Sequence, residues 1–323
     1  MADSDLWSTA ALSQDCACPA SNVAFASPLT ENDVPVDATD HVVGGYREVP
    51  PPADLAFAVE ALWTHEAAPH RTTIHRVVPD PAVSLCFTGV RDANGPGSSR
   101  LFLIGPVANA RMFAPDPGSH MSSVRIKLEW CRALLGVAPG EHEDAEYPYA
   151  LALPTLAVPL EDRLARTRTP ADVLRVLVDF LRARATAAQA ARRESCMPAP
   201  ALVSVAMEML RASAGRLRLA ALSARLGVTD RHLRRAILAE TSISPRRFAR
   251  VQRFHALLRD ADRAADPGWA ALAARHGYAD QSHLIRELQA LAGVTPGQLL
   301  AERRAEPAAE SDAAAVRTAA ATG

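Results

Sequence analysis

The sequence predicts an α+β protein, in which a β-rich N-terminal domain precedes an all-α domain of two helix-turn-helix units joined by a linker helix. Three observations lead to this prediction. Short apolar runs separated by Pro and Gly fill residues 46–153, which is typical of strands. Apolar residues then recur at helical spacing from Pro170 onward. Finally, a block that combines a short helix, a Gly turn, a polar cap and a second helix occurs twice after Ala201.

Composition and periodicity divide the 323 residues into five segments. Residues 1–42 mix Ser, Asp, Pro and Ala without a sustained period, and residues 305–323 are Ala-rich, so both are predicted to be disordered tails. Residues 43–185 form the β-rich domain, which ends in helices. Residues 186–200, with an Ala-rich start and two prolines, are the predicted linker. Residues 201–304 form the helical domain.

Periodicity also predicts individual elements of the N-terminal domain. The predicted strands include Ile74–Val78, Val83–Phe87, Leu101–Ile104 and Val124–Leu128. Helical spacing follows over residues 156–164 and 170–184. We expect the second of these helices to pack on the sheet or to pair with its copy in a dimer.

The net charge of −1 conceals an uneven distribution of charge. Residues 201–304 contain 17 Arg and 9 acidic residues, a formal charge of +8, while the rest of the chain carries 18 basic and 27 acidic residues. A basic helical domain favours a polyanionic partner such as double-stranded DNA. It disfavours the alternative that the helix pairs only bind another protein.

Cysteine usage and the N-terminus indicate the compartment. The five cysteines are odd in number and include no CxxC pair, so a disulfide scaffold is not expected. Asp3 and Asp5 stand where a signal peptide would carry positive charge, and no apolar run is long enough to span a bilayer. We therefore expect a cytoplasmic protein without a membrane segment.

The first helix-turn-helix unit begins with a short helix over Leu219–Leu226, turns at Gly227 and continues as a helix from Asp230 to about Ala239, with Thr229 as its cap. Its outward face is predicted to carry Arg231, Arg234 and Arg235. These side chains suit a major groove, because the planar guanidinium group can donate two hydrogen bonds to O6 and N7 of guanine. The alternative is an ordinary solvated helix face.

The second unit repeats this arrangement, with helices over Trp269–His276 and Gln281–Leu291, a turn at Gly277 and a cap at Asp280. The residues predicted to face outward are Gln281, Ser282, His283 and Arg286, a mixture of phosphate donors and base readers. For His283 the alternative is a polar surface residue or a partner of the helix cap.

A linker helix capped by Ser244 and started by Pro245 separates the two units. Its length would place the two recognition helices about one DNA turn apart, roughly 34 Å, so that both enter one side of the duplex. Arg246 and Arg247 at its start are placed to contact phosphates, although a solvated face explains them nearly as well.

The C-terminal pattern closely resembles the DNA-binding domain of the AraC/XylS family of bacterial transcription regulators over Val203–Leu300. The residues that carry the resemblance are Gly277, Asp280, Gln281, Ser282, His283, Arg286, Gly293, Thr295 and Pro296. Family members usually have Phe at the positions of Leu284 and Leu288. The leucines of this chain keep the core apolar at both positions.

The resemblance implies a sequence-specific regulator of transcription, activator or repressor, that binds promoter DNA and contacts RNA polymerase. Base contacts are assigned to Arg231, Arg234, Arg235, Ser282 and Arg286. Phosphate contacts are assigned to Thr229, Arg246, Arg247, Gln281 and His283.

The N-terminal domain resembles sensor-type domains of uncharacterised actinobacterial members of that family. The supporting residues are Tyr46–Glu48, Pro50–Pro52, Trp63, Arg76, Pro79, Asp80, Leu85, Phe87 and Leu134–Val137. This resemblance implies a cupin-like small barrel that binds a small-molecule effector or mediates homodimerisation. The effector, the operator sequence and the oligomeric state stay open.

Two enzyme hypotheses provide the alternative, namely a cupin-metal enzyme or a DNA-repair methyltransferase fused to the DNA-binding domain. The metal hypothesis would use His65, His70 and His75 with Glu66 and Asp80, but the close His-x-His pair is missing. The methyltransferase hypothesis would use Cys16, Cys18, Cys86 or Cys131, none of which has the basic neighbours that activate a thiol. We therefore expect no catalytic residue, metal or cofactor, and the role of Cys16 and Cys18 stays open.

Overall fold

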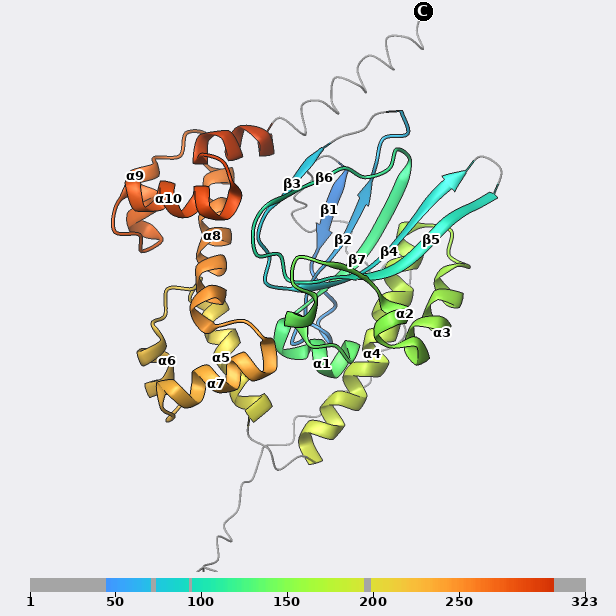
Figure 1. The fold of residues 1–323 in the computed structure, drawn as a ribbon, viewed down its shortest axis with the longest axis horizontal. Coiled ribbons are helices and arrows are strands. Elements are labelled where there is room, and N and C mark those ends of the chain that lie inside the picture. Colours follow the sequence, from blue (N-terminus) through green and yellow to red (C-terminus); the bar gives the residue numbers. More distant parts are fainter. Residues whose placement is uncertain (1–44, 71–73, 93–94, 195–198, 305–323) are drawn as a thin grey trace, which may run out of the picture.

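The computed structural model describes residues 45–70, 74–92, 95–194 and 199–304. The predicted tails over residues 1–42 and 305–323 lie outside the described residues, as do Cys16, Cys18 and Cys196. Figure 1 shows the arrangement of the described part, with the N-terminal sheet on one side and the C-terminal helices on the other.

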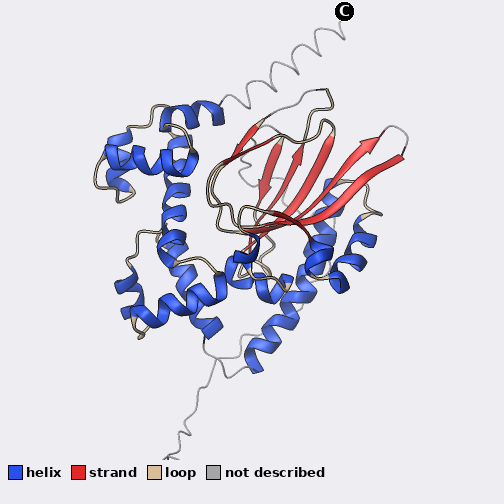
Figure 2. Ribbon diagram, viewed as in Figure 1, coloured by secondary structure: helices blue, strands red, loops and turns tan. Residues whose placement is uncertain are grey.

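The N-terminal domain is built around an antiparallel six-stranded sheet with the order β1-β2-β7-β4-β5-β8. A separate two-stranded sheet pairs β3 with β6 (Figure 2). The strands are β1 (Tyr46–Val49), β2 (Val59–Glu66), β3 (His75–Val77), β4 (Val83–Asp92), β5 (Gly95–Ile104), β6 (Arg111–Phe113), β7 (Ser119–Ile126) and β8 (Glu146–Pro148). Among the described residues β1 and β8 remain the two edges, so the sheet is open and does not close into the barrel that the resemblance implied.

One face of the sheet is covered by helices. These are α1 (Leu128–Leu135), the one-turn helix α2 (Tyr149–Ala152), α3 (Pro154–Leu164) and α4 (Pro170–Glu194). A short 3₁₀ helix, η1, spans Pro139–His142. Apolar side chains that alternate along β7 and β4, such as Val124, Ile126 and Leu85, are fully buried against Leu134 and Leu177. Burial of this face is what holds the sheet and helices together.

Helix α4 continues to Glu194 and does not end near Arg184, where the apolar period stops. Ala and Arg dominate the added stretch, and both have high helix propensity, which favours continuation of the helix. The following helix begins at Ala199, so residues of the predicted linker are largely helical.

The C-terminal domain consists of helices. They are α5 (Ala199–Ala212), α6 (Leu219–Arg225), α7 (Asp230–Thr241), α8 (Pro245–Arg263), α9 (Trp269–Arg275) and α10 (Gln281–Ala292), followed by helical residues 296–304. The pairs α6–α7 and α9–α10 are the two predicted helix-turn-helix units, and α8 connects them (Figure 1). Within the described residues no helix combines the length and apolar character that crossing a membrane requires.

Candidate nucleic-acid interface

The first helix-turn-helix unit forms as its sequence predicts. Gly227 adopts a φ of 65°, which lets the chain turn sharply between α6 and α7. The side-chain oxygen of Thr229 accepts a hydrogen bond from the amide of His232 at 3.2 Å and so caps α7. Leu233 and Ile237 are fully buried, which fixes the rotation of α7 about its axis. The opposite face of α7 is therefore turned to solvent.

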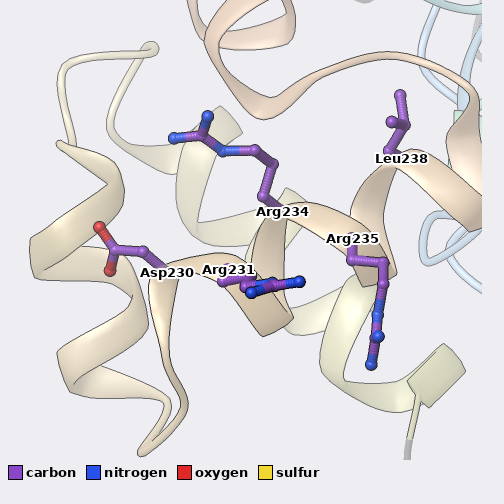
Figure 3. A pocket seen from close by; sticks show the side chains of 5 residues that line it. All are labelled: Asp230, Arg231, Arg234, Arg235 and Leu238. Carbon is purple, nitrogen blue, oxygen red and sulfur yellow. The ribbon is translucent and has the colours of Figure 1, made fainter.

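The solvent face of α7 carries the three predicted arginines, all exposed. Together with Asp230 and Leu238, they line a shallow hollow on the surface (Figure 3). Arg234 and Leu238 extend to one side of the helix and Arg235 to the other. Within the part of the chain that the structure describes, no carboxylate pairs with the guanidinium groups of Arg231, Arg234 and Arg235. Three guanidinium groups therefore outnumber the single carboxylate of Asp230 around this hollow, which gives it a net positive charge.

The second unit has the same construction. Gly277 turns the chain with a φ of 73°, and a carboxylate oxygen of Asp280 accepts a hydrogen bond from the amide of His283 at 2.7 Å. Leu284, Leu288 and Leu291 on α10 are buried. The side chains left exposed on its first turns are Gln281, Ser282 and Arg286.

His283 differs from the other predicted contacts because its ring is half-buried and partly engaged. Its Nδ1 accepts a hydrogen bond from the amide of Ala279 at 3.3 Å, and its ring stands edge-on to Tyr278 with centroids 5.6 Å apart. With Nδ1 as the acceptor, a neutral ring carries its proton on Nε2, which leaves Nε2 as a donor. His283 therefore takes part in the turn and keeps one donor for another partner.

The connecting helix α8 carries the other two predicted phosphate contacts. Its N-terminus is capped by Ser244, whose hydroxyl oxygen accepts from the amide of Arg247 at 3.2 Å. Arg246 is exposed, whereas Arg247 donates from both terminal nitrogens to Glu143 of the N-terminal domain at 2.9 and 2.7 Å. These hydrogen bonds hold the pKa of Glu143 below its usual value. Arg247 thus already contacts an anion within the protein.

Side chains of α8 also fix the second unit. Arg250 contacts Glu287 of α10 at 2.5 Å, and Arg253 lies over the ring of Tyr278 at 5.5 Å from its centroid. These contacts tie the turn and the recognition helix of the second unit to the connecting helix.

Two residues of this surface were not predicted from the sequence. Leu238 is 48% exposed beside the arginines, and a signal existed, because it lies four residues after Arg234 and three after Arg235 on an otherwise charged arc. Glu143 had no such signal, because its partner Arg247 is 104 residues away along the chain.

The residues that the enzyme hypotheses would use are divided between the core and the surface, with Glu66 and His70 exposed. Cys86 and Cys131 are fully buried, and burial raises the pKa of the Cys86 thiol to about 12, so a thiolate is scarce at neutral pH. His65 is buried with its ring edge-on to that of His75, at 5.2 Å between centroids. The described residues include no group of three or more His, Cys, Asp or Glu side chains that could hold a metal ion.

Comparisons with known proteins match each domain separately. Residues 222–302 match a family described as a helix-turn-helix domain, and residues 47–148 match a domain of unknown function, DUF6597. No curated protein matches the chain.

Solved structures of ToxT from Vibrio cholerae are similar at low level. ToxT of strain O395 is 12% identical with a TM-score of 0.36, covering 74% of this chain and 96% of its own. Unsaturated fatty acid bound wild-type ToxT of strain SCE256 is 12% identical with a TM-score of 0.36, covering 74% of this chain and 94% of its own.

The family match and the local geometry agree on the C-terminal domain. Both helix-turn-helix units, their caps and the exposed arginines of α7 lie within or beside residues 222–302. The chain therefore carries a C-terminal match to a helix-turn-helix domain over residues 222–302, preceded by a match to the domain of unknown function DUF6597 over residues 47–148.

Proposed function

We propose that this protein is a transcription regulator that reads two adjacent major grooves of double-stranded DNA with α7 and α10. One observation carries the proposal: the solvent face of α7 presents Arg231, Arg234 and Arg235 without carboxylate partners among the described residues, within an AraC-type domain. Uncompensated guanidinium groups on a capped, rigid helix are suited to guanine edges. Leu238 beside them suits the methyl group of thymine.

The remaining contacts are divided between bases and phosphates. Ser282 and Arg286 are proposed to reach bases from α10, and Thr229, Arg246 and Gln281 to contact phosphates. His283 would use Nε2 for a phosphate, since Nδ1 is engaged. Arg247 would exchange the carboxylate of Glu143 for two oxygens of a phosphate group, which can accept the same pair of hydrogen bonds.

The N-terminal domain completes the proposed regulator. We assign to it the response to a small-molecule effector and a role in homodimerisation, and we place the protein in the cytoplasm with RNA polymerase as a further partner. The proposal involves no catalytic step and no cofactor.

DNA binding can be tested with sites selected by the full-length protein from random duplexes, followed by binding titrations at several salt concentrations. Affinity should fall steeply with salt, because each neutralised phosphate releases counterions. Arg231→Ala should weaken binding to the selected site by about 1–3 kcal/mol and relax the preference at one base pair. Arg246→Ala should weaken all sequences alike and lower the salt slope by about one unit.

Arg175→Ala is the matched control, because this arginine of α4 pairs with Asp172 within the N-terminal domain. It removes the same charge and should leave the selected sequence and the affinity unchanged. Binding that ignores both sequence and salt would contradict the proposed function.

A further inference from the structure

The two helix-turn-helix units do not share a core. Among the described residues, the buried apolar side chains of the first unit, such as Leu222 and Ile237, belong to one cluster with the N-terminal sheet and helices. Those of the second unit, from Phe254 to Leu300, form a separate cluster. The chain connects the units only through α8, so contacts outside this helix help to decide how α10 lies relative to α7.

The first unit is joined firmly to the N-terminal domain. Arg211 of α5 donates two hydrogen bonds to Glu129 of α1, at 2.6 and 2.8 Å, and both side chains are largely buried. Arg247 and Glu143 add a second paired contact at the start of α8. The N-terminal domain and the first unit therefore behave as one body.

The second unit is held by the N-terminal domain at the C-terminal end of α10. Arg76 of β3 donates to the carbonyl oxygen of Ala292 at 3.1 Å, and the amide of Ala110 donates to the carbonyl oxygen of Leu291 at 2.9 Å. The last carbonyl groups of a helix lack partners within the helix, and a cation is favourable there. Figure 1 shows β3 and β6 on the side of the N-terminal domain that faces α10.

Arg76 extends this contact to the end of the domain. Its Nε and Nη2 donate to the carboxylate of Glu302 at 2.7 and 3.1 Å, and its side chain is only 18% exposed. Val78, two residues later, packs against the core of the second unit. Arg76 thus joins β3 both to Ala292, the last residue of α10, and to Glu302 in the helical residues that follow.

The segment that carries Arg76 is itself anchored. Asp80 pairs with Arg125 of β7 at 2.9 Å, and its backbone exchanges two hydrogen bonds with Val107. Next to it, the carbonyl of Pro79 contacts Nε2 of His255 on α8 at 2.7 Å. The large sheet is therefore connected through residues 76–80 to the middle of α8 and to α10.

We propose that Arg76 and the backbone amide of Ala110 position α10 relative to α7, so that the N-terminal domain sets the half-site spacing at which the protein reads DNA. This inference rests on the proposed function. Changing the spacing by one base pair moves the second half-site by about 3.4 Å and rotates it by roughly 34° about the duplex axis. The contacts of Arg76 and Ala110 hold the two units at one separation and make binding sensitive to that change. A connection through α8 alone would leave α10 more freedom to move relative to α7.

The test uses the full-length protein and duplexes in which one or two base pairs are inserted or removed between the two selected half-sites. Wild-type protein should prefer one spacing. Arg76→Ala removes charge-assisted hydrogen bonds, each worth roughly tenfold in an equilibrium constant, so discrimination between spacings should fall by about that factor. Ala110→Pro, which removes the other donor, should flatten the same profile, and Arg76→Lys should restore part of it.

Arg100→Ala is the control, because this arginine pairs with Glu146 inside the N-terminal domain and should keep the wild-type profile. Folding of each variant is checked by circular dichroism. An unchanged spacing profile in folded Arg76→Ala and Ala110→Pro proteins would overturn the inference while leaving the proposed function intact. Wild-type protein that binds no DNA would overturn the proposed function and this inference with it.

Discussion

Removing Arg211 should destabilise the protein strongly, because its buried partner Glu129 would lose the two charge-assisted hydrogen bonds that Arg211 donates. The Glu129 side chain is 2% exposed and that of Arg211 is 11% exposed, and two hydrogen bonds of 2.6 and 2.8 Å join them. Breaking a buried pair from one side typically costs about 3–5 kcal/mol. In Arg211→Ala the free energy of unfolding should fall by about this amount, and the melting temperature by roughly 10 °C.

The measurement is urea-induced unfolding followed by tryptophan fluorescence, since Trp130 directly follows Glu129 in α1. Arg182→Ala is the matched control, because Arg182 also forms two hydrogen bonds with a carboxylate, but its side chain is 24% exposed and that of Asp54 is 40% exposed. A pair this exposed should be worth less than about 1 kcal/mol.

A paired replacement separates the charge from the contact. Glu129→Leu combined with Arg211→Met fills similar volume without charge and should recover most of the lost stability. Equal stability of wild-type and Arg211→Ala, or a double variant as unstable as the single one, would refute the reasoning.

Three further perturbations follow from the same structure. Glu143→Gln frees Arg247 for a phosphate and should raise affinity for every DNA sequence and steepen the salt dependence by up to about one unit, while Glu146→Gln should not; titrations at several salt concentrations compare them. Burial lowers the pKa of His255, so the unfolded chain takes up a proton at higher pH than the folded one. Stability should be complete above about pH 6.5 and fall as pH drops below it, with a smaller fall in His255→Gln, as urea titrations across pH would show. Asp280→Ala removes the cap of α10 and should lower the free energy of unfolding by about 1 kcal/mol; an unchanged denaturation midpoint would contradict this role.

The features predicted from the sequence are those fixed by neighbours along the chain. The caps at Thr229, Ser244 and Asp280 accept hydrogen bonds from amides three residues ahead, and the sequence shows both partners at once. The buried faces of α7 and α10 follow from helical periodicity for the same reason.

The features that could not be predicted depend on long-range contacts. Arg76 contacts Glu302 across 226 residues, and nothing in the sequence around Arg76 indicates this partner. The open sheet depends on which strands become edges, which local patterns do not encode. The predicted base and phosphate contacts stay predictions, because they describe the protein with DNA.

The continuous core between the N-terminal domain and the first helix-turn-helix unit limits how the chain can be divided. Val203, Met207 and Leu210 of α5 are buried in the same cluster as Leu134 of α1. A fragment that starts at Ala201 would lose the part of this cluster that the N-terminal domain supplies, and the apolar surface left open would favour aggregation. A chimaera that joins this DNA-binding domain to the sensor domain of another protein would therefore have to include α1.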